Sequence, residues 1–208
     1  MGMIWLHRAV YRVRQFGSAL ATRGRPLAEV EQAEARAWLP AAAWPLFDAM
    51  PHNDQHHSLN VLRSLRTADH AEPALMQAAL LHDAAKSTGG VTLFHRIAVV
   101  LLKVVRPDWA ARLTQTPAPV RGNLRYPFWV LANHPQIGAE MAAAAGCDPL
   151  AVTLIRRHQE TGGGAGDQGS RRDRESREAP LAESSELMPD QTLADRLLAA
   201  LHVADDDN

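Results

Sequence analysis

Apolar residues recur at intervals of three and four along most of the chain, which is the spacing of one face of an α-helix. In the segment 3–20 the apolar stripe carries Leu6, Val10, Val13 and Leu20. The same periodicity predicts helices over 27–39, 42–50, from residue 55 onward, 73–86, 134–146, 148–160 and 190–208. The expected fold class is therefore all-α.

Residues that start and stop helices support these boundaries. Pro73, Pro135 and Pro149 each suit the first turn of a helix, where a missing N–H costs nothing. Asp148 and Asp190 are expected N-caps, and His134 stands at the N-cap position before Pro135.

The segment 91–132 has a less regular pattern, because four prolines interrupt it. One helix is expected over 94–105. The β-branched residues of that stretch leave a strand as the alternative.

The composition changes after residue 160. Residues 161–189 are rich in glycine, then in charge, and lack apolar periodicity, so we expect a mobile loop or a disordered insertion. The predicted organisation is an N-terminal helical extension over 1–49 and one compact helical bundle over 50–208.

Charge and composition exclude several classes of protein. Hydrophobic residues make up 46% of the chain, and its net charge of −1 gives no reason to expect a nucleic-acid partner. The single cysteine, Cys147, excludes an internal disulfide and fits a reducing compartment. No apolar run approaches the length of a membrane span, so we expect a cytoplasmic protein. The basic face of segment 3–20 could bind phosphate, anionic lipid or an acidic partner, but solvated arginines are the favoured interpretation.

Histidines and aspartates on the apolar faces of the predicted helices carry the functional signal. His82, with Asp83 beside it, continues the stripe of Leu75 and Ala79. On four other helices, His134, His158, Asp205 and one of the neighbours His56 and His57 stand on or beside the buried faces. A lone buried His-Asp pair is most often a hydrogen-bonded pair in a core. Six such groups would be costly to bury without a cation, and this mixture of nitrogen and oxygen ligands suits first-row metal ions. Two divalent ions would satisfy all six groups, with Asp83 able to bridge them.

The motif "LLHDAAK" and this order of histidines and aspartates resemble the HD-domain superfamily of metal-dependent phosphohydrolases. The likeness covers about residues 50–205 and is greatest to the six-ligand, two-metal branch. That branch includes HD-GYP cyclic-di-GMP phosphodiesterases, cyclic-di-AMP phosphodiesterases and diadenosine tetraphosphate hydrolases. The Gly-Tyr-Pro signature of the HD-GYP group is absent. In "DQHHSLNV" the resemblance selects His57 rather than His56.

The resemblance implies an HD-type enzyme that hydrolyses a small phosphate ester, such as a nucleotide, through a hydroxide bridging two first-row metal ions. Its metal ligands would be His57, His82, Asp83, His134, His158 and Asp205. Asp83 and Lys86 would be catalytic, with Lys86 meeting charge on the phosphoryl oxygens. The alternative for Lys86 is a surface lysine at the end of its helix. Lys86, Arg96 and Arg125 are candidate substrate-binding residues, and Lys103 and Arg121 are further cations near them.

Two other functions compete with hydrolysis. Some two-iron HD-type sites oxidise organic substrates, and a non-catalytic domain could bind a nucleotide as a sensor or scaffold. The presence of all six ligand candidates argues against a pure binding module. The sequence leaves the substrate, the metal and the oligomeric state open.

Overall fold

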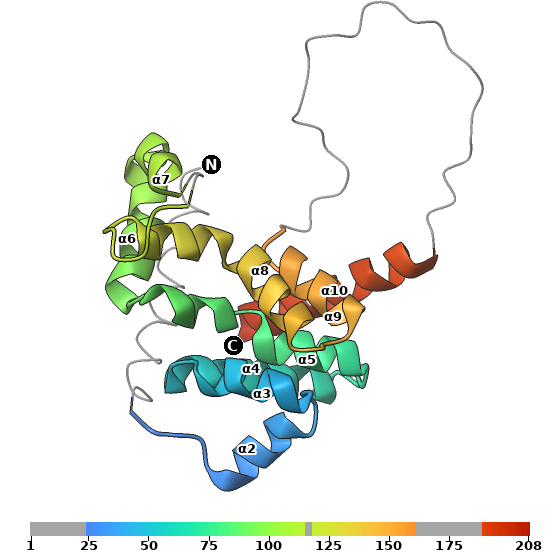
Figure 1. Ribbon diagram of the computed structural model, residues 1–208. Coiled ribbons are helices and arrows are strands. Elements are labelled where there is room, and N and C mark those ends of the chain that lie inside the picture. Colours follow the sequence, from blue (N-terminus) through green and yellow to red (C-terminus); the bar gives the residue numbers. More distant parts are fainter. Residues whose placement is uncertain (1–23, 115–117, 161–188) are drawn as a thin grey trace, which may run out of the picture.

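Helices make up all of the regular secondary structure in residues 24–114, 118–160 and 189–208, which are the residues that the computed structural model describes (Figure 1). The expected all-α class is confirmed. The helix predicted over 3–20 lies outside the described residues. So does the predicted insertion, apart from Pro189.

The helices follow one another with short connections. The α-helices are α2 (Glu29–Arg36), α3 (Trp44–Asp48), α4 (His52–Thr67), α5 (Pro73–Leu81), α6 (Leu93–Val105), α7 (Pro107–Thr114), α8 (Tyr126–Ala144), α9 (Pro149–Arg157) and α10 (Pro189–Asp207). Two 3-10 helices, η1 (Ala41–Ala43) and η2 (Ala84–Gly89), complete the described elements. The segment 94–105 is therefore helical, and the alternative of a strand there is wrong.

Helix α5 forms the centre of the bundle, between α4 and α9 (Figure 1). Its sequence, PALMQAALL, is apolar on nearly every side, and such a helix is stable only when it is surrounded. Seven of its nine residues are buried. The core that encloses it also includes Leu27 and Phe47, so the described part of residues 1–49 packs on the same hydrophobic centre.

Several predicted helix boundaries are wrong, and the helix expected from residue 55 onward already begins at His52. Helix α5 ends at Leu81 instead of continuing to Lys86, and the chain tightens into η2 after Asp83. Helix α8 begins at Tyr126, which places His134 and Pro135 inside it. Helix α10 already includes Pro189 and Asp190, so Asp190 is not outside the helix as an N-cap. The expected cap at Asp148 is confirmed, because its carboxylate accepts a hydrogen bond from the backbone N–H of Leu150 at 2.7 Å.

Two glycines allow η2 and α9 to lie close to α8. A Cβ atom on Gly89 would lie 2.7 Å from Cβ of Val130, which is closer than real Cβ atoms approach. A Cβ atom on Gly138 would meet Ile155 and Ala85 at 3.4 and 3.6 Å. The turn after α5 is therefore pressed directly against α8.

The C-terminal end of α10 is attached to α4. Asn208 donates hydrogen bonds to Oγ of Ser64 and to the carbonyl oxygen of Ala204, both at 2.8 Å. Helix ends otherwise fray. These bonds hold the last turn, which contains Asp205, against the bundle.

No helix among the described residues has both the length and the apolar character needed to cross a membrane.

Candidate metal centre

The fold brings all six predicted ligand residues to one place. His57 lies on α4, His82 and Asp83 follow α5, and the remaining three come from α8, α9 and α10, namely His134, His158 and Asp205. His82, Asp83, His134 and His158 are buried, while His57 and Asp205 lie at the edge of the cluster. Their role as ligands stays a prediction.

Three of the histidines share one arrangement. Nδ1 of His82 bonds to the carbonyl oxygen of Ala79 at 3.0 Å, and His134 and His158 bond in the same way to Leu131 and Ile155, at 2.8 and 2.6 Å. A carbonyl oxygen only accepts, so in each ring Nδ1 must carry the proton. In the neutral ring this leaves a lone pair on Nε2.

The local sequence explains why these carbonyl groups are free to accept. Carbonyl groups in the last turn of a helix have no intrahelical partner. Ala79 and Ile155 lie in the last turns of α5 and α9. In α8 the same vacancy arises at Leu131, because Pro135, four residues later, has no N–H. Pro135, at which the sequence predicted a helix start, thus leaves the carbonyl oxygen of Leu131 free to accept a hydrogen bond from Nδ1 of His134.

The Nε2 atoms of His134 and His158 face each other. They are 3.1 Å apart, and Oδ1 of Asp83 lies 3.3 Å from the first and 3.7 Å from the second. Two neutral rings with protonated Nδ1 atoms would direct two lone pairs at each other. A cation between these rings and Asp83 would resolve that conflict.

The other half of the cluster surrounds His82. Its Nε2 atom is buried and makes no hydrogen bond. It lies 3.5 Å from Oδ1 of Asp205 and 3.7 Å from Oδ2 of Asp83. Nε2 of His57 lies 2.8 Å from the same Asp205 oxygen. The arrangement offers an unpartnered imidazole nitrogen next to two carboxylates.

These donors form two groups that share Asp83. Within each group the possible ligand atoms lie less than 4.8 Å from one another: His57, His82 and Asp83 in one, and Asp83, His134 and His158 in the other. A metal ligand histidine usually donates its other ring N–H to a carbonyl or carboxylate, as the three buried histidines do. The residues therefore fit divalent first-row ions in donor type and in ring orientation.

Without a metal ion, the two carboxylates draw a proton into the cluster. Burial disfavours charge on His82, but Asp83 and Asp205 outweigh it and raise the pKa of His82 to about 9. Burial would raise the pKa of Asp83, yet Lys86 and His82 hold it well below its usual value. For His158, burial and the neighbouring charge of His82 lower the pKa to about 3. The metal-free site thus prefers a positive charge at His82 and a neutral ring at His158.

Lys86 belongs to the cluster and is not a solvated surface residue. Its Nζ atom donates to Oδ2 of Asp83 at 2.5 Å, and its side chain is 15% exposed. The turn from α5 into η2 makes this contact possible, because Lys86 stands three residues after Asp83 in a 3-10 segment. The ammonium group of Lys86 therefore lies beside the shared carboxylate.

Arg96 forms an ion pair that the sequence did not predict. Both terminal nitrogens of its guanidinium group bond to the carboxylate of Asp54, and both side chains are mostly buried. Burial disfavours the charge of Arg96, but Asp54 raises its pKa. The one available signal was that Asp54 precedes His57 by three residues on the same helix.

Arg125 makes its contact elsewhere. It is exposed, and it donates to the carbonyl oxygen of Arg112 on α7 at 2.6 Å. Arg121 is also exposed and approaches the hydroxyl of Tyr126 at 3.4 Å. The structure thus places Lys86, but not Arg125, in contact with the cluster.

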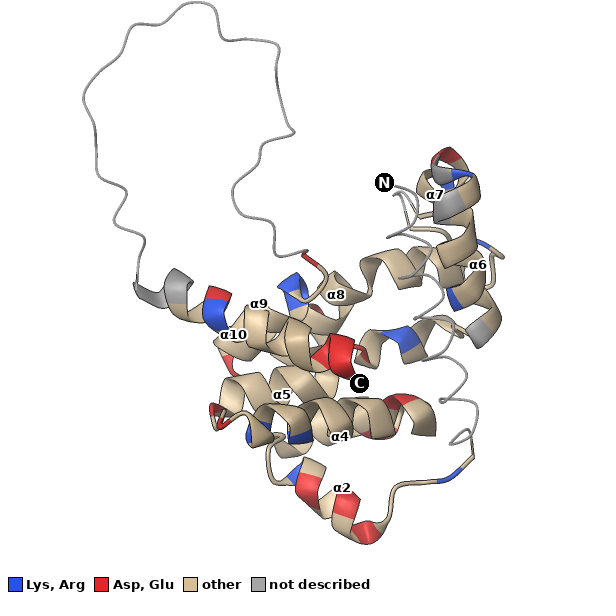
Figure 2. Ribbon diagram, turned by 180° about the vertical axis from the view of Figure 1, so that it is seen from behind, with Lys and Arg blue, Asp and Glu red and all other residues tan. Residues whose placement is uncertain are grey.

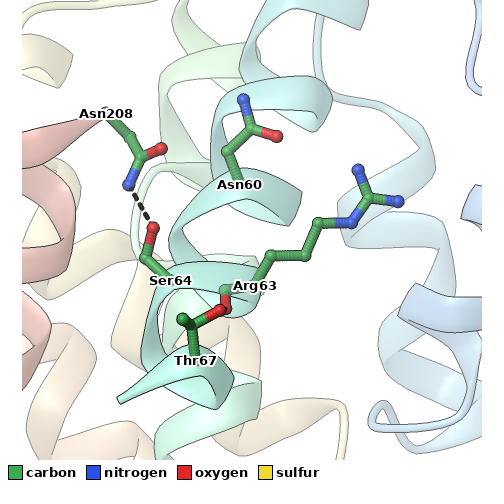
Figure 3. Close-up of a pocket in the computed structure, with 5 residues that line it drawn as sticks. All are labelled: Asn60, Arg63, Ser64, Thr67 and Asn208. Atoms are coloured by element: carbon green, nitrogen blue, oxygen red, sulfur yellow. Dashed lines mark hydrogen bonds between the residues drawn. The ribbon is translucent and has the colours of Figure 1, made fainter.

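A separate shallow pocket lies on the outer face of α4 (Figure 3). Its lining residues are Asn60, Arg63, Ser64, Thr67 and Asn208. The arginine in it is paired with Glu34 at 2.7 Å and lies 3.6 Å from Glu31. Its positive charge is therefore balanced, and the pocket itself offers no metal ligand group.

Comparison of the chain with protein-family models, curated proteins and solved structures finds no match.

Proposed function

We propose that this protein is a metal-dependent phosphohydrolase of the HD type, which cleaves a small phosphate ester at the His-Asp cluster. The observation that carries the proposal is the set of buried Nε2 atoms gathered around Asp83. The Nε2 atoms of His134 and His158 face each other at 3.1 Å, and Nε2 of His82 has no hydrogen bond. That arrangement is costly without a cation and favourable with one.

The candidate ligands are His57, His82, Asp83, His134, His158 and Asp205. When bound, divalent ions would supply an acidified water and would offset charge on a phosphoryl group. The sharing of Asp83 between two groups of donors supports two ions rather than one.

Lys86 supports a phosphate ester as the substrate. A cation beside the cluster can donate to a phosphoryl oxygen as negative charge grows there. Hydrolysis joins the oxygen of water to phosphorus and breaks the bond from phosphorus to the leaving oxygen. In its resting position Lys86 donates to Asp83, so its mobile ammonium group would exchange this acceptor for the substrate.

Metal analysis of the purified protein, combined with a hydrolysis screen, tests the proposal. We expect about two first-row ions per chain. With Mn²⁺ or Fe²⁺ supplied, we expect release of phosphate or nucleotide from a panel of nucleotides, dinucleotides and model esters. His82→Gln should lose both metal and activity. His70→Gln, which changes a half-exposed histidine after the end of α4, should retain both.

Lys86→Met separates catalysis from metal binding. It should keep the metal and lower kcat by about a hundredfold, which is typical of removing one group that stabilises the transition state. Absence of metal after growth with sufficient metal would contradict the site. A stable mixed-valent iron pair without any ester hydrolysis would instead favour oxidation chemistry.

A further inference from the structure

The segment from α6 to the start of α8 exposes an unusual amount of apolar surface. Among the described residues eight large apolar side chains are exposed, and six of them lie between residues 94 and 124. These six are Phe94, Leu101, Val105, Trp109, Val120 and Leu124. We name them the α6–α7 apolar patch. Figure 1 shows α6 and α7 projecting from one end of the bundle.

The pattern of α6 explains why half of the patch cannot be covered by this bundle. Phe94, Leu101 and Val105 are separated by seven and four residues, so they fall on one face of the helix. Arg96 stands on the opposite side and is held inward by its ion pair with Asp54. That pair orients α6 so that its apolar stripe faces outward.

Basic residues surround this apolar surface. Between residues 91 and 125 the chain has six basic residues and one acidic residue, Asp108. Arg96 is the one of these that forms an ion pair among the side chains that the structure describes, and its partner is the buried Asp54. Arg106, Arg112, Arg121 and Arg125 are exposed, and Figure 2 shows basic positions in blue on the described parts of α6 and α7. The patch therefore combines apolar and cationic character.

We propose that the α6–α7 apolar patch and its arginines bind the surface of an anionic lipid bilayer. Exposed apolar side chains that include a tryptophan would enter the boundary between headgroups and acyl chains, while the arginines contact anionic headgroups. Val120 and Leu124 are 81% and 90% exposed. They protrude from the connection before α8, as expected of side chains that insert rather than of side chains that line a groove.

Charge argues against the two other occupants available to this chain. A symmetric dimer through the patch would place the same arginines opposite one another, and like charges repel. The N-terminal residues 1–28 contain five arginines and no acidic residue, so they would be repelled as well. A nucleic acid would satisfy the arginines but would leave Leu101, Val105 and Leu124 without a partner. An anionic bilayer satisfies both kinds of side chain.

Flotation of the full-length protein with vesicles tests this proposal. One set contains phosphatidylcholine alone, and the other contains phosphatidylcholine mixed with phosphatidylglycerol. We expect binding to the anionic vesicles that weakens as salt is raised to ~0.5 M. Leu101→Gln with Val105→Gln, and separately Arg112→Glu with Arg121→Glu, should each reduce binding by about tenfold. All four side chains are exposed, so circular dichroism and metal content should remain unchanged.

Two control variants match these changes elsewhere on the surface. Val30→Gln alters an apolar side chain on α2 that is similarly exposed, and Arg196→Glu alters an exposed arginine on α10. Both should bind vesicles like the unaltered protein. The proposal is overturned if the folded protein ignores anionic vesicles, or if the two double variants bind normally. It is also overturned if those variants only convert a dimer to a monomer, or if binding depends solely on Arg8, Arg12 and Arg14.

Discussion

The Nε2 atoms of His134 and His158 lie 3.1 Å apart, and the Nδ1 atom of each ring bonds to a backbone carbonyl oxygen. The Nε2 lone pairs of the two buried rings therefore face each other in the folded protein. Such an arrangement lowers the stability of the metal-free protein, and the same geometry favours a cation that accepts both lone pairs.

Replacing one of these two rings should separate stability from metal binding. His158→Leu removes one lone pair and leaves an apolar side chain in a buried position. We expect the metal-free variant to be more stable than the unaltered protein by about 1 kcal/mol, because a buried unsatisfied polar group is removed. Added Mn²⁺ should raise the melting temperature of the unaltered protein but not that of the variant. A loss of stability in the metal-free variant would contradict the repulsion.

The stability of the metal-free protein should decrease on both sides of about pH 6.5. The pKa of His82 is raised to about 9 in the folded state, so its contribution is complete below the unfolded value of about 6.5 and is lost as the pH rises through 9. The pKa of His158 is lowered to about 3, so its contribution is present above 6.5 and is lost as the pH falls through 3.

Urea denaturation in the presence of a chelator, repeated across this pH range, measures both effects. His82→Gln removes the group that loses its proton on the alkaline side. Its unfolding free energy should therefore change little between pH 6.5 and 9, while the decrease at acid pH remains. If the unfolding free energy of this variant still decreases at alkaline pH, a group other than His82 is responsible.

The ion pair between Asp54 and Arg96 should contribute strongly to the position of α6. Asp54→Asn leaves a mostly buried guanidinium group without its counter-charge, and we expect a loss of about 3 kcal/mol. Arg96→Met in the same chain removes the stranded charge and should restore much of that loss. A double-mutant cycle from urea denaturation measures the coupling. Additive effects of the two substitutions would show that the pair contributes nothing.

Gly89→Ala should disturb the cluster without changing any of its side chains. The added Cβ atom would lie 2.7 Å from Cβ of the buried Val130, so η2 or α8 must move. We expect a loss of about 2 kcal/mol, which is typical of overpacking, together with a lower metal affinity, because η2 directly follows Asp83. Val130→Ala on the same chain should relieve the contact and recover metal binding. Gly24→Ala, with open space around it, is the matched control.

The sequence predicted most helices because their apolar stripes are continuous and their boundaries are local. The cap at Asp148 needed only its own neighbours. The predicted start of α8 was wrong because a side-chain hydrogen bond within the helix compensates for the proline. Pro135 is typical of a helix start, yet α8 continues through it. Nδ1 of His134 donates to the carbonyl oxygen of Leu131, which Pro135 leaves without a backbone donor.

In the candidate cluster, too, local spacing predicted some features and contacts in the folded chain decided others. Periodicity alone could place the histidines and aspartates on inward faces, since it depends only on the helical repeat. It could not reveal that Arg96 would be paired with Asp54, because these residues are 42 positions apart and meet only in the folded chain. Nor could it show that Lys86 would turn back to Asp83, which depends on α5 ending at Leu81.

The sequence by itself determined the all-α class and placed histidines and aspartates on the inward faces of five helices, and both follow from local spacing. The choice of His57 over its neighbour His56 came from the resemblance to a known family. Only the tertiary structure decided which two nitrogens face each other and which side of α6 remains exposed. These depend on contacts between helices far apart in the chain, and no repeat within one helix encodes them.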